Sequence, residues 1–128
     1  MKNGLYAIYN GREYEAGVKE DGSITLRSND SNDLKNGFTL YKNIIYIKRV
    51  KSNEVESIYS TITYADYNGC KCQVIKEIDD KLLLNAILGD YKIFVSLGFD
   101  MVDRGVYNKW VNAKDVERVY EIREAISI

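Results

Sequence analysis

The chain has 128 residues, of which 45% are hydrophobic and 29% charged, and proline is absent. This length fits one domain or two very small ones, and the composition excludes a disordered or low-complexity chain. Because 18 basic residues are balanced by 19 acidic ones, we do not expect the strongly basic surface of a general nucleic-acid-binding protein.

The first half of the chain predicts a series of β-strands. Residues 6–9 are expected to form a short strand that runs into Asn10-Gly11, a strong hairpin-turn signal. The return strand, residues 12–19, alternates apolar and charged side chains, which indicates one buried face and one exposed face. Asp21-Gly22 then turns the chain into a strand at 23–28. After a polar segment at 28–37, the β-branched residues at 44–50 predict another strand.

The second half follows the same plan. Asn68-Gly69 is the first turn, CKCQVIKEI at 70–78 is the return strand, and Asp79-Asp80 leads into the apolar segment 81–88. Residues 113–126 are the one candidate for a long helix, with a cap at Asn112. The corresponding segment of the first half, residues 52–63, is rich in Thr and Ile, which favours a strand in both halves.

Two sequence blocks recur in the same order. YAIYNG at 6–11 returns as YADYNG at 64–69, and KRVKSNEVESIY at 48–59 returns as KWVNAKDVERVY at 109–120. The first pair is separated by 58 positions and the second by 61, so the second copy contains three extra residues, as a longer surface loop would. These matches predict an internal duplication, with repeats at 1–61 and 62–128.

The end of each repeat resembles the end of an SH3 domain. VKSNEVE at 50–56 and VNAKDVE at 111–117 are similar to the 3₁₀ turn and final strand that close SH3-like barrels. The resemblance implies an all-β protein made of two tandem SH3-like barrels. Neither repeat has the paired tryptophans of a signalling SH3 domain, and the closing turn lacks its proline, so recognition of proline-rich peptides is not carried over. A single β-sandwich or an α+β fold is the alternative.

The residue types needed for most enzymatic sites are missing. Without histidine, no Ser-His-Asp or Cys-His system can form. Cys70 and Cys72 are too few for a zinc site or a disulfide scaffold, and we expect them to be small buried side chains. Adjacent carboxylates fall on a polar strand face or in turns, where solvated charge explains them. We therefore expect no catalytic residue, no metal and no cofactor, although Asp103 and Arg104 offer one minor enzymatic alternative.

The tyrosine content and the acidic loops indicate a partner-binding surface. The chain has 11 Tyr against 3 Phe and a single Trp, and Tyr and Trp supply large, stiff contact areas at interfaces. The segments 28–42 and 98–107 carry acidic groups that can steer a basic partner. The residues predicted to contact the partner are Asp30, Asp33, Tyr41, Asp100, Asp103, Tyr107 and Trp110.

In overall kind the chain resembles the immunity proteins of bacterial polymorphic-toxin systems of the contact-dependent inhibition type. The similarity lies in its small size, slight acidity, lack of histidine and the segment DRGVYNKWVNAKDVERVYEIRE at 103–124. It implies a non-enzymatic protein that blocks the active site of a cognate toxin domain, such as a nuclease, as a monomer or weak dimer. An adaptor that binds a peptide or nucleic acid is the alternative. Because no signal peptide or membrane span is evident, we expect a soluble cytoplasmic protein that binds neither membranes nor, as an immunity protein, nucleic acid directly.

Overall fold

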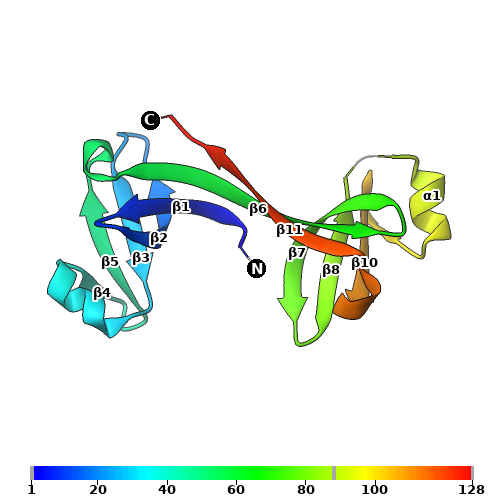
Figure 1. The fold of residues 1–128 in the computed structure, drawn as a ribbon, viewed down its shortest axis with the longest axis horizontal. Helices are drawn as coiled ribbons and strands as arrows, with labels where there is room; N and C mark the ends of the chain where they lie inside the picture. The colour runs from blue at the N-terminus through cyan, green and yellow to red at the C-terminus, as the bar shows by residue number, and fades with distance from the viewer. Residues whose placement is uncertain (1, 88, 128) are drawn as a thin grey trace. The chain divides into compact units, whose positions relative to one another are not determined.

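The computed structural model describes residues 2–87 and 89–127. Within these residues the backbone forms eleven β-strands, one short α-helix and three 3₁₀ turns (Figure 1). Backbone hydrogen bonds join all eleven strands into one sheet, and the paired registers are antiparallel. The all-β class predicted from the sequence is confirmed.

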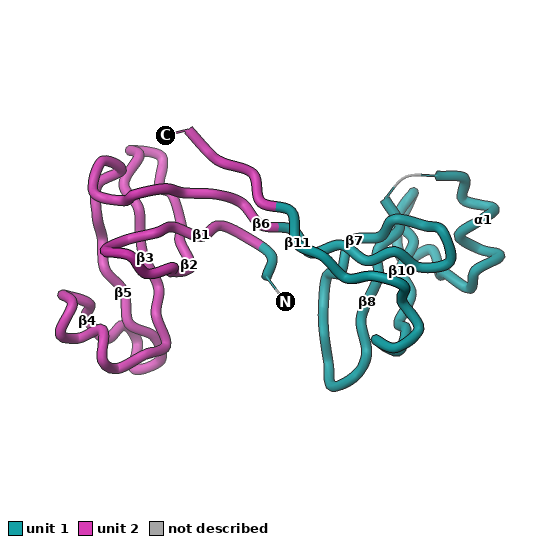
Figure 2. Tube along the Cα trace, in the orientation of Figure 1, with its two compact units in different colours: residues 1–3, 62–122 teal, residues 4–61, 123–128 magenta. Residues whose placement is uncertain are grey.

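The chain divides into two compact units, which Figure 2 shows in different colours. Unit 2 contains Gly4–Thr61 and residues 123–128, and unit 1 contains Ile62–Ile122 and residues 1–3. The main division falls between Thr61 and Ile62, inside one long strand. Each unit therefore includes one half of the chain and a short piece of its far end, which the predicted ranges 1–61 and 62–128 did not foresee.

Unit 2 is built of antiparallel strands. Its strand order is β4-β5-β3-β2-β1-β6, where only the first part of β6 belongs to this unit. The elements in chain order are β1 (Gly4–Tyr9), β2 (Arg12–Val18), β3 (Ile24–Ser28), the 3₁₀ turn η1 (Ser31–Asn36), β4 (Thr39–Tyr41), β5 (Ile45–Val50), the 3₁₀ turn η2 (Ser52–Glu54) and β6 (Ser57–Tyr67).

Unit 1 repeats this order of elements. From the second part of β6 its strand order is β6-β7-β8-β10-β9, and β11 pairs with β6. The elements are β7 (Cys70–Ile78), β8 (Lys81–Ala86), the helix α1 (Tyr91–Ser96), β9 (Asp100–Asp103), β10 (Val106–Asn112), the 3₁₀ turn η3 (Ala113–Asp115) and β11 (Arg118–Ala125). The segment that was the one candidate for a long helix is thus a 3₁₀ turn followed by a strand, as the favoured interpretation had it.

Local geometry also repeats between the units. The first hairpin of each turns at an Asn-Gly pair in which both residues have positive φ, +50° and +76° at Asn10-Gly11 and +47° and +80° at Asn68-Gly69. The three extra residues of unit 1 lie between β8 and Phe99. Phe38 follows Ser28 by ten residues, whereas Phe99 follows Ala86, the equivalent of Ser28, by thirteen. That the units are SH3-like barrels stays a prediction.

Each unit buries its own hydrophobic cluster. In unit 2 the cluster includes Ile24, Leu26 and Phe38, and the ring of Tyr14 lies 4.9 Å from that of Phe38. In unit 1 it includes Val74, Leu84, Phe94 and Phe99. Cys72 belongs to it and is fully buried as predicted, whereas Cys70 is only partly buried. The alternating pattern of β2 holds for Tyr14 and Ala16, while Val18 at the end of the strand is 38% exposed.

The ends of the chain are attached to opposite units. The Asn3 side chain donates to the carbonyl of Val74 at 2.8 Å and accepts from the Thr63 amide at 2.8 Å, both within unit 1. At the other end the Ile126 amide donates to the carbonyl of Ile58 at 3.0 Å within unit 2. No helix in the described part of the chain is long and apolar enough to cross a membrane.

Candidate functional site

A groove of about 810 Å³ opens on unit 2, next to the hairpin β1–β2 and the loop between β3 and η1. We call it the Asp33 groove. Two tyrosine rings and one isoleucine line it, but its character is set by charged side chains. These are the carboxylates of Glu13, Glu15, Asp30 and Asp33 and the guanidinium groups of Arg12 and Arg27.

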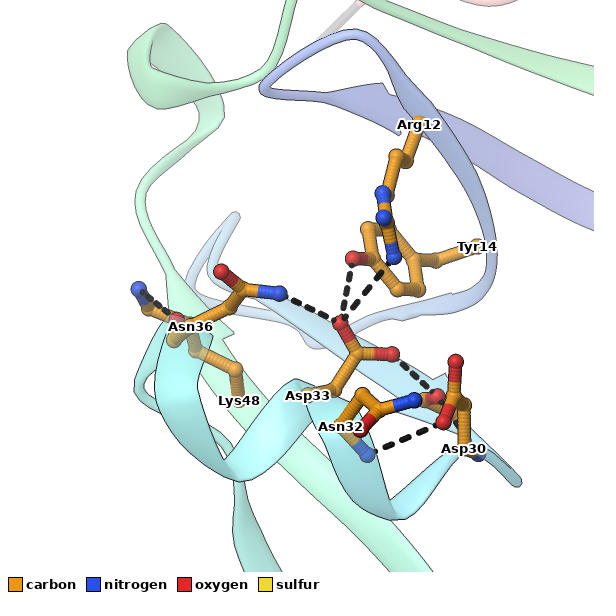
Figure 3. Close-up of polar contacts among 8 residues, drawn as sticks. Arg12, Tyr14, Asp30, Asn32, Asp33, Asn36 and Lys48 are labelled. Carbon is orange, nitrogen blue, oxygen red and sulfur yellow. Dashed lines mark hydrogen bonds and ion pairs between the residues drawn. The ribbon is translucent and has the colours of Figure 1, made fainter.

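Asp33 lies at the bottom of this groove and is 2% exposed. Its oxygen Oδ1 accepts hydrogen bonds from Tyr14 Oη and Asn36 Nδ2, each at 2.8 Å, and Oδ2 accepts from Ser28 Oγ (Figure 3). The nearest guanidinium nitrogen of Arg12 is 3.9 Å from Oδ1. Three neutral hydrogen-bond donors and one cation therefore stabilise the carboxylate, as a buried charge requires.

This environment fixes the ionisation of both acidic groups in the network. Desolvation alone raises the pKa of Asp33, but the hydrogen bonds from Ser28, Asn36 and Tyr14 and the charge of Arg12 outweigh it, so the pKa lies below its usual 3.8. Desolvation and the neighbouring carboxylate raise the pKa of Tyr14 above 10.0. At neutral pH the pair is thus an ionised Asp33 and a neutral, hydrogen-bond-donating Tyr14.

The rim of the Asp33 groove holds further ion pairs. Glu15 lies 3.9 Å from Arg27, and both side chains are about half exposed, so this pair is weak. Glu13 lies 3.6 Å from Arg123 of the C-terminal segment and also accepts a hydrogen bond from Tyr59. Asp30 caps η1 by accepting from the Asn32 amide at 2.9 Å, and within the described residues it has no cation in contact.

The counterpart positions of unit 1 are apolar. Tyr14 pairs with Ala7 as Cys72 pairs with Ala65, and Ser28 pairs with Tyr46 as Ala86 pairs with Tyr107. By the same correspondence, the polar set of unit 2 and its unit 1 equivalents are Arg12 and Cys70, Tyr14 and Cys72, Ser28 and Ala86, Asp33 and Phe94, and Asn36 and Leu97.

Phe94 fills the place that Asp33 has in the other unit. It is 5% exposed, and its ring centroid lies 6.1 Å from that of Phe99 and 5.7 Å from that of Tyr107. Cys72 beside it is so thoroughly buried that the pKa of its thiol rises to about 12, desolvation being the main cause. One chain thus contains a polar and an apolar version of the same arrangement, and only the polar version lies beneath a charged groove.

The residues predicted from the sequence fall into two groups, one on each unit. Asp30 and Asp33 both line the Asp33 groove, but Asp33 is inside, so its carboxylate holds the loop and does not face a partner. Tyr41 on β4 is 44% exposed and lines a separate hollow of about 410 Å³ that also includes Arg49. Sequence reasoning missed Arg12, Tyr14 and Arg27, whose roles depend on residues far away in the chain.

On unit 1, Asp100 and Trp110 share one face of the sheet. Asp100 pairs with Asn108, and Trp110 lies two residues further along β10, so the two side chains point to the same side. Trp110 is 43% exposed and lines a hollow of about 680 Å³ with Ile78, Asp79 and Asp80. Asp103 is exposed at the end of β9, whereas Tyr107 is half buried against Phe94.

Metal ligands do not converge in the described part of the chain. Among residues 2–87 and 89–127 there is no group of three or more Cys, Asp or Glu side chains arranged to hold a metal ion. In the Asp33 groove the carboxylates of Asp33, Glu15 and Glu13 are engaged by arginines or hydroxyl groups, and that of Asp30 accepts from a backbone amide.

Comparison with known proteins places the chain in a family. Residues 1–127 match the family described as "uncharacterised conserved protein UCP033725", and the chain belongs to it. No curated protein and no solved structure matches the chain.

Proposed function

We propose that the protein is a non-enzymatic binding protein, an immunity protein that neutralises a bacterial toxin domain by covering its active site. The observation that supports this most is the charge of the Asp33 groove. In the described part of the chain, three of its four carboxylates, those of Asp33, Glu15 and Glu13, lie next to a guanidinium group. The fourth, that of Asp30, forms no ion pair with the residues described. The groove therefore suits one more cation, supplied by a lysine or arginine of the partner.

A partner of this kind fits the proposed task. A toxin domain that acts on nucleic acid carries basic side chains where it binds phosphates, and an acidic protein surface competes for those side chains. Opposite charges also accelerate encounter, which is what an inhibitor needs when it must reach the toxin before the substrate does.

The contrast between the two units supports a functional reason for the groove. Burying a carboxylate costs desolvation energy, and unit 1 forms the same arrangement of strands with Phe94 in its place. The polar set is therefore not a requirement of the architecture. It holds Arg12 and the loop that carries Asp30 in position at the mouth of the groove.

The direct test asks whether a gene beside that of this protein encodes a toxin domain, and whether the purified protein binds that domain. Purified wild-type protein should form a one-to-one complex with that domain, and its expression should protect cells from it. Asp30→Asn removes the charge but still offers a side-chain oxygen that can cap η1. It should weaken binding about tenfold and reduce the salt dependence of association. Glu20→Gln is the matched control, because it also removes one negative charge from an exposed position of unit 2. It should leave binding unchanged.

The outcomes separate the site from the function. If Asp30→Asn binds like wild type while the complex forms, the interface lies elsewhere, for example around Asp100 and Trp110. If wild-type protein neither binds nor protects against any neighbouring toxin, the immunity function is wrong.

The adaptor alternative is favoured by one observation, the exposed indole of Trp110 over a hollow with two carboxylates. An adaptor should bind short peptides or oligonucleotides with a change in the fluorescence of this tryptophan, the only one in the chain. Trp110→Phe should abolish that signal without changing the affinity for a toxin domain bound through the Asp33 groove.

A further inference from the structure

The two ends of the sheet carry strands with a free edge. β4 is the first strand in the sheet order and β9 the last, so in the described residues each is hydrogen-bonded to a strand on one side only. Free edges are usually covered or carry charged side chains along their length. Here the centres of both edges are apolar and exposed: Leu40 48%, Tyr41 44%, Met101 62% and Val102 58%.

The charges at these edges determine which edges can pair. β9 begins at Asp100 and ends at Asp103, so antiparallel pairing of two β9 strands sets aspartate opposite aspartate, which is unfavourable. β4 is followed directly by the exposed Lys42. Antiparallel pairing of β4 with β9 sets Leu40 opposite Val102 and Tyr41 opposite Met101. Lys42, the first residue of the turn that follows β4, has φ +53° and comes next to Asp100 at the end of the paired segment.

We propose that the protein associates with a second copy of itself by pairing β4 of one copy with β9 of another. The strand that would cover each edge is present on the chain itself. It has a similar length, an exposed apolar centre and an opposite charge at one end. The proposal is independent of the toxin-binding function. Because β4 has three residues and β9 four, the contact contributes few backbone hydrogen bonds, and the association is weak and reversible.

Each copy has one edge of each kind, so the contact is heterologous. Such contacts produce either a closed ring or a chain that grows with concentration. The measured mass at high concentration distinguishes the two, and both follow from the same pairing.

Sedimentation velocity over a concentration series from micromolar to millimolar tests the proposal. The wild-type protein should shift from monomer to larger species. Asp100→Lys alone and Lys42→Asp alone should each raise the dissociation constant about tenfold, because attraction is replaced by repulsion across the pair. Asp80→Lys, which makes the same charge change at an exposed turn of unit 1, is the control and should associate like wild type.

Mixing the variants gives the decisive measurement. Asp100→Lys protein and Lys42→Asp protein should associate with each other more strongly than either does with itself, because both kinds of β4–β9 contact between unlike copies regain opposite charges. The double variant Lys42→Asp/Asp100→Lys should regain association with itself. All these positions are exposed, and circular dichroism checks that the variants are folded. A wild-type protein that stays monomeric to millimolar concentration, or a mixture no stronger than its components, would overturn the proposal.

Discussion

Asp33 and Phe94 occupy equivalent buried positions in the two units but require different surroundings. A carboxylate there requires donors on every side, and Tyr14, Ser28 and Asn36 provide them. A phenyl ring requires only apolar neighbours, which Phe99 and Tyr107 provide. Each solution depends on a matched set of residues, so a single exchange within either set leaves it incomplete.

Removing the Asp33 carboxylate should destabilise unit 2 strongly. Asp33→Ala leaves the hydroxyl groups of Tyr14 and Ser28 and the amide of Asn36 without their buried acceptor, and we expect a loss of about 3 kcal/mol in the free energy of unfolding. Chemical denaturation followed by circular dichroism measures this loss. Asp30→Asn, which retains a capping side chain, should change stability by only a few tenths of a kcal/mol, about the difference between good caps. Equal effects of the two substitutions would contradict the role assigned to Asp33.

Stability should also depend on pH through the same carboxylate. In the folded protein the pKa of Asp33 lies below its ordinary value of 3.8, so the ionised form favours folding. This contribution is fully present above the unfolded pKa and is lost as the pH falls from there through the lower folded pKa. The stability difference between wild type and Asp33→Asn, measured by urea denaturation from neutral pH to about pH 3, should therefore shrink on the acidic side. A difference that stays constant through this range would mean that folding does not shift the pKa of Asp33.

At the scale of elements, a lysine ammonium group contacts a carbonyl group at the end of both η1 and α1. Lys48 Nζ donates to the carbonyl of Asn36 at 2.9 Å and lies 4.9 Å from the ring centre of Tyr9. Lys109 Nζ donates to the carbonyl of Leu97 at 2.7 Å and lies 4.9 Å from the ring centre of Tyr67. In both units a glycine with positive φ follows directly, Gly37 or Gly98, and leaves room for the ammonium group.

Because Lys48 lies so close to Gly37, replacing Gly37 by alanine should reduce stability more than replacing Gly11 does. Gly37 has φ +86°, and a Cβ atom there meets Lys48 Nζ at 2.9 Å, so the lysine must release its carbonyl. Gly11 has φ +76° but open space around its Cβ position. Both alanine variants carry the cost of left-handed backbone, about 1 kcal/mol, and Gly37→Ala should lose about 1 kcal/mol more. Thermal unfolding of the two variants checks the difference, and equal losses would show that Lys48 moves freely.

The elements that sequence patterns predict are those with local signals. Alternation and the Asn-Gly turns were sufficient for the hairpins β1–β2 and β6–β7. By contrast η1, α1, β4 and β9 were missed, because helical turns of six residues and edge strands of three or four depend on tertiary contacts. The polar segment 28–37 was interpreted as an exposed acidic loop. Asp33 is buried there, and one of the donors that its carboxylate needs is Tyr14, nineteen residues earlier in the chain.

At the scale of the whole molecule, the exchange of chain ends predicts a selective effect of truncation. Removing residues 123–128 eliminates the ion pair of Arg123 with Glu13, its contact with the Tyr59 ring and the hydrogen bond from Ile126 to Ile58. We expect unit 2 to lose about 2 to 3 kcal/mol, and unit 1 to keep its stability. Amide hydrogen exchange should therefore accelerate in β1 and β2 and stay unchanged in β7 and β8. Uniform acceleration throughout the chain would contradict this division.

The same exchange predicts that unit 2, whose main segment is made first, is the last to be completed. A ribosome makes Gly4–Thr61 first, yet the segment that completes unit 2 begins at Arg123, after all of Ile62–Ile122. All the residues of unit 1 are present earlier, because residues 1–3 are already made when Ile122 is added. The nascent chain therefore completes its later half before its earlier one. Until then the start of β6 lacks the segment that lies beside Ile58, and we expect this temporarily open edge to be prone to misassembly during translation.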